Sequence, residues 1–518
     1  MSSCSKRCLV LLEKCKNMKH LKQAHAQVFI TGLHTNTFAL SRLLAFCSHP
    51  HHGSLIYACR LFQHIHHPTL CICNTLIKAF LLKAKFYDTL HVFTKMLQSG
   101  LYPDNYTIPY VLKACAALHS CSLGQMVHGY SSKSGLLFDI FVGNSLMAMY
   151  SVCGDVVAAR YVFDEIPRLS AVSWSVMISG YAKVGDVDSA RLFFDEAPEK
   201  DRGIWGAMIS GYVQNSCFKE GLYLFRLLQL TEVVPDESIC VSILSACAHL
   251  GALDIGIWIH RYLNRAAVPL SIRLSTSLLD MYAKCGNLDL AKRLFDLMPE
   301  RDIVCWNAMI SAMALHGDGA NALKLFSDME KAGMKPDDIT FIAVFTACSY
   351  SGMSHEGLQL LYKMCSVHKM EPKSEHYSCL VDLLSRAGRF EEAMVMMRRI
   401  SNSGNASEET LAWRAFLSAC CNHGQAQLAE RAAERLLRLQ NHSGVYVLLS
   451  NIYSASGKHS DARRVRDMMR NKGVDKVPGS SSVEIGGVVS EFIAGEETHP
   501  MMKEIHSVLE KMHLQLLD

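Results

Sequence analysis

Apolar positions along this chain follow a helical period that restarts every thirty-odd residues. In one stretch they fall at Trp306, Met309, Ile310 and Met313, the i, i+3, i+4, i+7 spacing of a single helix face. A glycine then marks a turn, and a second apolar stretch follows in which a small residue precedes an aromatic residue by four positions. The pattern predicts a succession of helical hairpins. The glycines are Gly154, Gly185, Gly286, Gly317 and Gly388, and the pairs are Ala159/Phe163, Ala190/Phe194 and Ala291/Phe295.

The hairpins form an internal repeat of unequal lengths. "FVGNSLMAMYSVCGDVVAARYVFDEIP" from Phe141 returns as "RLSTSLLDMYAKCGNLDLAKRLFDLMP" from Arg273. Units that bury their apolar faces only against their neighbours build an elongated solenoid. The sequence therefore predicts an all-α fold, an α-solenoid with a small non-repeat C-terminal extension. Units of 31 residues are 140–170, 171–201 and 272–302, and units of 35 are 70–104, 105–139, 202–236, 237–271 and 303–337.

Cysteine and proline usage agrees with this prediction. Prolines close the second helix of the 31-residue units, and four of the 20 cysteines share one repeat position, which marks them as small core residues. No C-x-x-C pair occurs, and none of the 24 histidines forms H-x-E or H-E-x-x-H, so the sequence predicts no metal site and no cofactor. The prolines are Pro167, Pro198 and Pro299, and the cysteines are Cys115, Cys247, Cys348 and Cys420.

Hydropathy and charge limit the remaining classes. Half of the residues are hydrophobic, yet no run of about 18 apolar residues exists, so we expect no membrane span. A net charge of +4 is weakly basic for a nucleic-acid-binding protein, although it allows one that reads bases and contacts few phosphates.

Particular phrases of the repeat resemble a known family. "PDNYTIPYVLKACA", "LLDMYAKCGNLDLAKRLFDLMPERD" and "VDLLSRAGRFEEA" are similar to pentatricopeptide repeats over nearly the whole chain. The alternation of 35, 35 and 31 residues resembles the plant PLS subfamily, in which P, L and S motifs alternate. The resemblance implies a right-handed superhelix that binds single-stranded RNA, with about one base for each repeat.

The resemblance also implies an organisation of the chain. Residues 1–36 are expected to hold a short targeting segment and a partial L repeat, and 37–409 the PLS-type repeats. Residues 410–477 resemble the E1 and E2 helical motifs, and 478–518 the E+ type extension. Two insertions, "HPHH" at 49–52 and the polar "SNSGNASEE" at 401–409, are expected in the S units, the second as a loop.

The C-terminal extension has its own pattern. "VPGSSSVEIGGVVSEFIAGEETHP" at 477–500 alternates with period two, which predicts a short hairpin of strands. Ser480, Ser481 and Ser482 stand where relatives often carry an aromatic residue. Some relatives continue into a cytidine deaminase domain, whose chemistry needs H-x-E followed by P-C-x-x-C. None of these parts precedes Asp518, so we expect no catalytic residue and no enzymatic activity in this chain.

Base recognition is implied at the fifth and last residues of each unit. An Asn offers a donor and an acceptor at a length that suits a pyrimidine, whereas Ser and Thr leave room for a purine. Five pairs follow: Asn74 with Asp104 for U, Asn144 with Ser170 for C, Ser175 with Asp201 for a purine, Thr276 with Asp302 for G, and Asn307 with Asp337 for U. Val172 and Val304 occupy the position that packs against bases, and Ser378 is the fifth residue of the last S unit. Gly206 with Asp236 is expected to be a weak reader, and the L units, with Pro109, Val241 and Ile342, to read no base edge.

Function and location follow as expectations from the resemblance. The chain would recognise sites for organellar C-to-U RNA editing. It would recruit a cytidine deaminase in trans, and multiple organellar RNA editing factors, through the L repeats and the E/E+ region. An RNA stabilisation or translation factor without editing remains open, whereas a tetratricopeptide-like protein-binding scaffold is disfavoured because its repeats keep one length near 34. The resemblance implies an organelle, and the first twelve residues, which contain Lys and Arg and no acid, have the composition of a transit peptide; the mitochondrion is preferred, with the chloroplast open.

Overall fold

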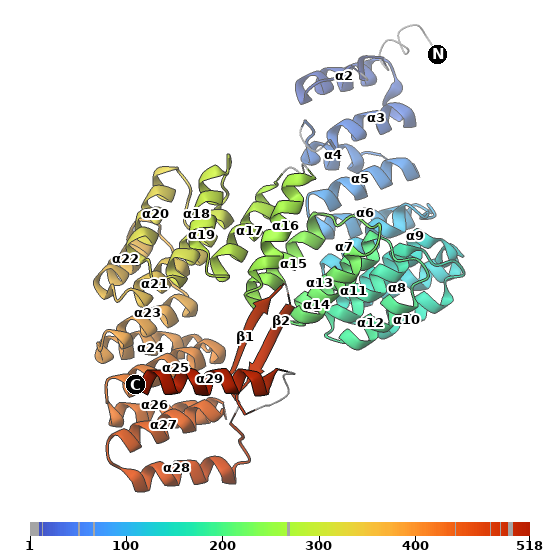
Figure 1. The fold of residues 1–518 in the computed structure, drawn as a ribbon. Helices are drawn as coiled ribbons and strands as arrows, with labels where there is room; N and C mark the ends of the chain where they lie inside the picture. Colours follow the sequence, from blue (N-terminus) through green and yellow to red (C-terminus); the bar gives the residue numbers. More distant parts are fainter. Residues whose placement is uncertain are drawn as a thin grey trace. The chain divides into compact units, whose positions relative to one another are not determined.

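The computed structural model divides the chain into two compact units, Met1–Ile239 and Cys240–Asp518. It describes residues 10–12, 14–49, 52–65, 68–266, 270–440, 442–476, 478–486, 488–495 and 501–517. Both units consist of successive helical hairpins (Figure 1). The predicted all-α solenoid is confirmed.

In unit 1 the first helices of consecutive hairpins pack against one another. The contacts run from α5 to α7, α9, α11 and α13, while each following helix packs behind its own partner. In chain order the elements are α2 (Met18–Ile30), η1 (Leu33–Thr35), α3 (Thr37–Cys47), α4 (Leu55–Gln63), α5 (Leu70–Leu82), α6 (Phe86–Gln98), α7 (Thr107–Ala117), α8 (Cys121–Lys133), η2 (Leu136–Phe138), α9 (Ile140–Cys153), α10 (Val156–Glu165), α11 (Ala171–Lys183), α12 (Val187–Glu196), α13 (Arg202–Gln214) and α14 (Phe218–Gln229).

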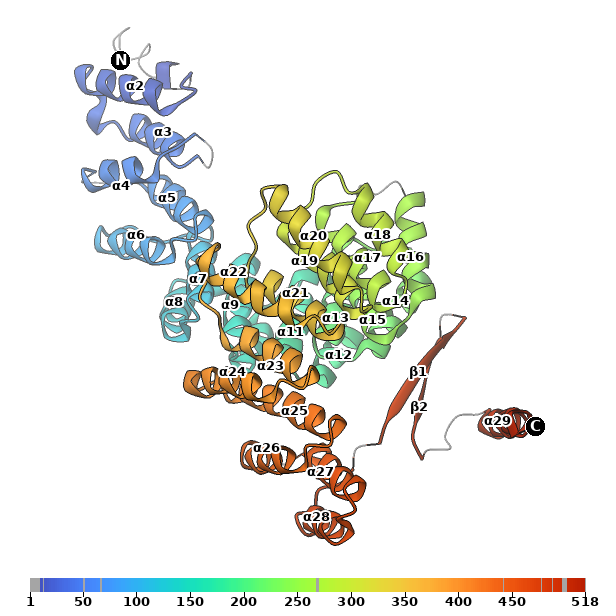
Figure 2. The same ribbon diagram turned by 90° about the vertical axis from the view of Figure 1, so that its left-hand side faces the viewer.

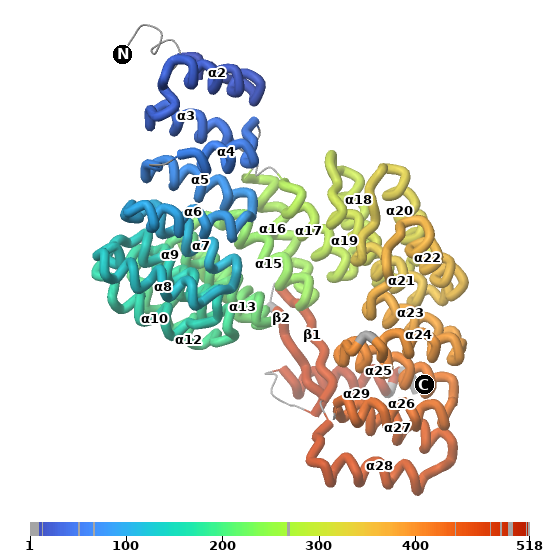
Figure 3. The backbone as a smooth tube through the Cα atoms, turned by 180° about the vertical axis from the view of Figure 1, so that it is seen from behind, coloured from blue at the N-terminus to red at the C-terminus, as the bar shows by residue number. Residues whose placement is uncertain are grey.

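Unit 2 repeats this arrangement, with contacts from α17 to α19, α21, α23 and α25. Its last hairpins, α25–α26 and α27–α28, continue the same stack (Figure 3). The elements are α15 (Glu237–Leu250, which starts at the border), α16 (Leu253–Arg265), α17 (Ile272–Lys284), α18 (Leu288–Leu297), α19 (Ile303–Leu315), α20 (Gly319–Lys331), α21 (Asp338–Tyr350), α22 (Ser354–Ser366), α23 (Ser374–Arg386), α24 (Phe390–Ser403), α25 (Ala406–Asn422), α26 (Ala426–Leu439), α27 (Ser443–Ala455), α28 (His459–Asn471), β1 (Ser480–Ile485), β2 (Val488–Ile493) and α29 (Met502–Leu517).

An aromatic contact joins each 31-residue hairpin to the next one. In unit 2, Phe295 of α18 meets Trp306 of α19 edge to face, with ring centroids 5.1 Å apart. Ala291, one turn before Phe295, is fully buried, and so allows close approach of the paired helices. The predicted pairing of a small residue with an aromatic residue is confirmed, and the same contact joins Phe163 to Trp174 at 5.1 Å and Phe194 to Trp205 at 4.9 Å in unit 1.

Local signals end the helices where the sequence predicted. Gly154 and Gly286 follow first helices with φ of 84° and 87°, a left-handed conformation that glycine adopts without steric cost. The second helices α10, α12 and α18 each end two residues before their proline. The four cysteines at the shared repeat position are fully buried, as expected for core residues.

The C-terminal extension contains the predicted strand hairpin, which is confirmed (Figure 2). β1 and β2 pair antiparallel, with Ser480 opposite Ile493. Glu484 of β1 accepts hydrogen bonds from the backbone N–H groups of Asp254 (2.8 Å) and Ile255 (3.3 Å) at the start of α16. Since the N-cap residue Ala252 offers no side-chain acceptor, Glu484 supplies the cap that α16 lacks in its own sequence.

One sequence expectation about the insertions is wrong. Residues 401–409 do not form a loop, because α24 continues to Ser403 and α25 already begins at Ala406. Gly404, with φ of 73°, ends α24, and Asn405 caps α25 by accepting from the Glu408 N–H at 3.3 Å. Polar residues alone predict a loop poorly, since Glu near a helix N-terminus favours the helix. Part of the insertion at 49–52 and of the targeting segment lies outside the described residues.

Candidate nucleic-acid interface

A groove of about 820 Å³ runs along the first helices of unit 2. Its walls come from α15, α17, α19 and α21, so it follows the direction of the stack. Five of the predicted RNA-binding residues line it together, namely Thr276, Asp302, Val304, Asn307 and Asp337. Residues far apart in the sequence thus face one continuous surface.

Asn307 in this groove belongs to a network of three side chains. Its amide Nδ2 donates to Oδ1 of Asp337 at 3.0 Å, and its Oδ1 accepts from the hydroxyl of Thr340 at 2.6 Å. The Thr340 hydroxyl also accepts from the Asp337 backbone N–H at 3.1 Å. Asn307 is only 5% exposed and Thr340 is fully buried, so the network is held rigidly between two hairpins.

The same network recurs in unit 1. Asn74 donates to Oδ1 of Asp104 at 3.2 Å and accepts from the Thr107 hydroxyl at 2.7 Å. Thr107 is fully buried, and its hydroxyl accepts from the Asp104 backbone N–H at 3.3 Å. The same arrangement in two separate repeats indicates that the network is a recurrent feature of the repeat.

A third copy replaces the carboxylate by a hydroxyl. Asn144 donates to Oγ of Ser170 at 3.4 Å and accepts from Oγ of Ser173 at 2.7 Å. Ser173 is fully buried and accepts from the Ser170 backbone N–H at 3.1 Å. Because a hydroxyl both donates and accepts, Ser170 constrains the amide less than an aspartate does.

The two predicted purine readers have different surroundings. Ser175 donates to the Val172 carbonyl of its own helix at 3.0 Å, and no hydrogen bond joins it to Asp201 among the described residues. Thr276 donates to the Ile272 carbonyl at 2.8 Å and lies 2.8 Å from Sγ of Cys305. Neither side chain is tied to the last residue of its unit, in contrast to the three asparagines.

Three of the predicted last residues also have a plain structural role. Asp201, Asp302 and Asp337 are N-caps of α13, α19 and α21, and each accepts from a backbone N–H three residues later. Such caps stabilise a helix by roughly 1 kcal/mol. The recurrence of aspartate at this position is therefore partly explained by helix capping, and base recognition would use the lone pairs that the cap leaves free.

The carboxylates of the network are firmly ionised. Burial acts to raise the pKa of Asp337, but hydrogen bonds from Thr340 and Asn307 outweigh it and lower the pKa below its ordinary value. The same balance, with Thr107, Asn74 and the Tyr106 N–H as donors, lowers the pKa of Asp104. Both groups therefore act only as acceptors at neutral pH.

Apolar and basic side chains border the asparagines. Val172 and Val304, in the first turns of α11 and α19, are 55% and 56% exposed, so their methyl groups are accessible to a ligand. At the corresponding place of α17 stands the exposed Arg273, which lines the groove together with Lys284. Lys284 pairs with Asp280 of the same groove at 2.9 Å, so Arg273 is the more available of the two cations for a phosphate.

The last predicted residue, Ser378, has a partner that the sequence analysis missed. Its hydroxyl donates to Oε2 of Glu408 at 2.8 Å, across the same 30 residues that separate Asn307 from Asp337. Glu408 lies in the first turn of α25, within the segment expected to be a loop. The additional turn at the start of α25 places the longer side chain of a glutamate beside the fifth residue, where the other units place an aspartate.

Three further side chains of the asparagine networks, Thr107, Ser173 and Thr340, were not predicted from the sequence. They are the third residues of the units that follow Asn74, Asn144 and Asn307, at separations of 33, 29 and 33 residues. A signal was present, because among units 70–373 a hydroxyl residue occurs at the third position only after a unit with Asn at its fifth.

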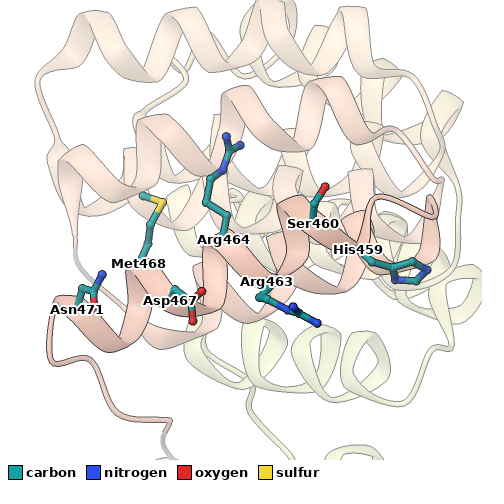
Figure 4. A pocket seen from close by; sticks show the side chains of 7 residues that line it. All are labelled: His459, Ser460, Arg463, Arg464, Asp467, Met468 and Asn471. Atoms are coloured by element: carbon teal, nitrogen blue, oxygen red, sulfur yellow. The ribbon is translucent and has the colours of Figure 1, made fainter.

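A second hollow, of about 590 Å³, lies on the exposed face of α28 (Figure 4). Arg463 and Arg464 project from this helix in different directions, and Arg464 pairs with Asp461 at 3.2 Å. Met468, 41% exposed, adds an apolar contact area between polar residues. Ala462 and Val465 are buried on the opposite side, so this face remains open to solvent.

The described residues form no metal-binding cluster and no membrane-spanning helix, and two of the core cysteines have protonated thiols. No group of three or more His, Cys, Asp or Glu suited to a metal ion occurs in the described ranges. Burial raises the pKa of the Cys348 and Cys420 thiols to about 12, so these two remain protonated. Among the helices that the structure describes, none has the length and apolar character needed to cross a membrane.

Family models match the chain in several places. The model described as PPR repeat matches residues 172–201, 203–230, 274–303 and 375–405, and the PPR repeat family model matches 301–349. A further model, described as E motif, matches 423–484, which includes α26, α27, α28 and most of β1.

Relatives extend over nearly the full length. One Arabidopsis thaliana pentatricopeptide repeat-containing protein is 38% identical over 513 residues, covering 98% of this chain and 79% of the relative. Another, named mitochondrial, is 37% identical over 606 residues (97% and 88% covered), and a third, named chloroplastic, is 35% identical over 613 residues (98% and 82%). The chain belongs to the pentatricopeptide repeat family. It carries an E motif, as the resemblance to plant members of that class implied.

Solved structures give a looser likeness. The maize pentatricopeptide repeat protein PPR10 is 16% identical, with a TM-score of 0.48 over 88% of this chain and 77% of that one. A structure of PPR10 with an 18-nucleotide RNA element has a TM-score of 0.43 over 90% and 82%.

Proposed function

We propose that this chain binds single-stranded organellar RNA along its first helices and selects sites for C-to-U editing, with the deaminase supplied in trans. The observation that carries the proposal is the asparagine network. Asn74 with Asp104 and Asn307 with Asp337 have the same spacing, the same partners and the same phase of the repeat in two separate units. Pentatricopeptide repeats read roughly one base per unit with two or three side chains.

The groove of unit 2 offers each contact that such binding requires. Val304 presents an apolar surface for a base, Asn307 and Asp337 present polar groups for its edge, and Arg273 and Lys284 can contact phosphates. Since few cations are involved, we expect a shallow dependence of affinity on salt.

The E motif supports the editing part of the proposal. Deamination of cytosine needs a zinc-bound water and a glutamate, and none of the described residues forms such a centre. The open face of α28 lies within the matched E motif and offers Arg463, Arg464 and Met468 to a protein partner. We propose that the deaminase and multiple organellar RNA editing factors bind through this region and the L repeats.

The relatives support a location in an organelle, because one is named mitochondrial and another chloroplastic. We propose the mitochondrion as the location.

Sequencing of organellar transcripts from plants with and without this protein tests the proposal. We expect one or a few cytidines to lose editing in its absence, with transcript abundance unchanged. Normal editing together with a loss of transcript or of its translation would instead assign a stabilisation or translation role. The purified chain should bind single-stranded RNA and deaminate nothing, and cytidine conversion by the chain alone would contradict the proposal.

A further inference from the structure

We propose that Thr107, Ser173 and Thr340 are positioning residues, whose buried hydroxyls fix the orientation of the asparagine amides and thereby set base selectivity. The inference rests on the proposed RNA binding and deepens it. None of the three hydroxyls belongs to the fifth or last position that the sequence analysis assigned to base recognition. Each lies in the following unit and is fully buried.

The network at Asn307 leaves one favourable arrangement. The Thr340 hydroxyl accepts from the Asp337 N–H, so its single proton is free to donate. That proton lies within reach of Oδ1 of Asn307 (2.6 Å) and Oδ1 of Asp337 (2.8 Å). The Asp337 oxygen already accepts from the Thr340 N–H at 2.8 Å and from Asn307, whereas the Asn307 oxygen has no other donor among the described residues. Donation to Asn307 therefore satisfies every group.

A rotated amide would break this arrangement. Turning Asn307 by 180° about its last bond would place its oxygen against the Asp337 carboxylate and its NH₂ against the Thr340 hydroxyl. The first contact is repulsive and the second forces the hydroxyl proton away. With the observed orientation, one amide N–H is used by Asp337 and the second remains for a base in the groove that Asn307 lines. The unit thus presents a donor, which suits the carbonyl oxygens of a pyrimidine.

The three copies should depend on the hydroxyl to different extents. At Asn74 and Asn307 the aspartate also opposes rotation, because a carboxylate only accepts. At Asn144 the last residue is Ser170, which donates as readily as it accepts. Ser173, whose own proton is directed by the Ser170 N–H at 3.1 Å, is then the main group that orients the amide. Removing the Ser173 hydroxyl should have the largest effect.

Comparison among the units separates this role from helix capping. Helices α13, α17 and α19 begin normally with Ile204, Leu274 and Cys305 at the third position, so a hydroxyl is not needed to start a helix. In the three units that precede these helices, the fifth residue is Ser, Val and Thr respectively, and in none is it Asn. The hydroxyl therefore accompanies the asparagine and not the cap.

The test measures how tightly each of several full-length variants binds each of four RNAs. The variants are Ser173→Ala, Thr107→Val and Thr340→Val, and the ligands are single-stranded RNA oligonucleotides with each of the four bases opposite the unit concerned. Thr89→Val is the matched control, because Thr89 is equally buried but its hydroxyl donates only to the Lys85 carbonyl of its own helix. Thr340→Ser keeps the hydroxyl and should retain selectivity.

In Thr340→Val we expect the ratio of affinities for the preferred base and for the other three bases to fall about two- to tenfold, the value of one net hydrogen bond. In Ser173→Ala this ratio should fall further. Thr89→Val should leave the advantage unchanged. Equal weakening of all four RNAs, or unchanged selectivity in Ser173→Ala, overturns the positioning role while RNA binding stands. A wild-type chain that binds no single-stranded RNA overturns both the positioning role and the proposed function.

Discussion

The amide nitrogen of Asn307 lies 3.0 Å from Oδ1 of Asp337, although thirty residues and a complete helix separate them in the chain. The contact closes the gap between the first helices of two successive hairpins. The same contact between Asn74 and Asp104 measures 3.2 Å. The stacking of the hairpins thus brings the fifth and last residues of a repeat into direct contact.

Thr276→Asn should change the preference of unit 272–302 from G towards a pyrimidine, since the longer amide enters the space of a purine. A base-edge contact is worth roughly 1–3 kcal/mol, so affinity for an RNA with G at this place should fall by about tenfold or more. Cys305 is the third residue of the following unit, the position at which a hydroxyl follows each of the three asparagine units. The double change Thr276→Asn with Cys305→Thr should therefore select the pyrimidine more sharply than Thr276→Asn alone. Binding assays with all four bases measure both effects. If U or C at that position rescues neither variant, Thr276 is not a base reader.

The order of units predicts the RNA that is bound. By the resemblance, RNA runs 5′ to 3′ along the chain, and the last S unit, with Ser378, lies at position −4 from the edited C. Counting back one base per unit gives U at −6 for unit 303–337, G at −7 for 272–302, a purine at −10 for 171–201, C at −11 for 140–170 and U at −13 for 70–104. Positions −5, −8 and −12 face L units and should be weakly read. Transcripts from plants with and without the protein decide this, and affected cytidines that match no better than random ones contradict the register.

Stability should fall as the pH drops below about 6.5. Burial lowers the pKa of His128 and His260, with Glu165 partly opposing it at His128, and each Nδ1 bonds a tyrosine hydroxyl, of Tyr150 and Tyr282, at 2.9 and 2.8 Å. Above the ordinary histidine pKa both rings are neutral whether the chain is folded or unfolded. Below it the unfolded chain takes up protons first, so the free energy of unfolding decreases as pH falls through the folded pKa.

Urea denaturation at pH 7.5 and pH 5.5 measures this effect. A variant with His128→Gln and His260→Gln keeps a hydrogen-bonding side chain but has no proton to gain, so its midpoint should differ less between the two pH values. Asp104 and Asp337 do not interfere, because their pKa values lie below the ordinary carboxyl value. An identical pH dependence in the variant and the wild type would assign the effect to other groups.

Glu484→Ala should loosen the start of α16, because it removes the acceptor for the N–H groups of Asp254 and Ile255. A lost N-terminal cap costs roughly 1 kcal/mol, which corresponds to about fivefold faster exchange of amides protected by local opening. Hydrogen exchange followed by mass spectrometry reports this on peptides that cover α16. Glu484→Gln retains one acceptor oxygen and should show a smaller increase. Unchanged exchange in Glu484→Ala would mean that the strand hairpin does not cap α16 in solution.

The sequence by itself determined the hairpins, their boundaries and the common phase of the candidate readers. These features depend on local physics: a 3.6-residue period selects the buried face, a glycine permits the turn after α9, and a proline ends α10. The one failure, at 401–409, came from judging polarity without helix propensity, since Glu408 and Glu409 sit in the first turn of α25.

Tertiary structure decided which side chains meet. Thr340 reaches Asn307 across 33 residues, and Glu484 reaches Asp254 across 230, and neither contact is specified by a neighbour in the sequence. Both arise because helices stack at distances that only packing fixes, and because buried polar atoms must then find partners among whatever residues the stack brings near. The residues at fifth and last positions could be identified from the repeat, and the sequence also holds a hydroxyl at the third position after each Asn unit, but the contact between that hydroxyl and the asparagine is established only by the stacking of adjacent hairpins.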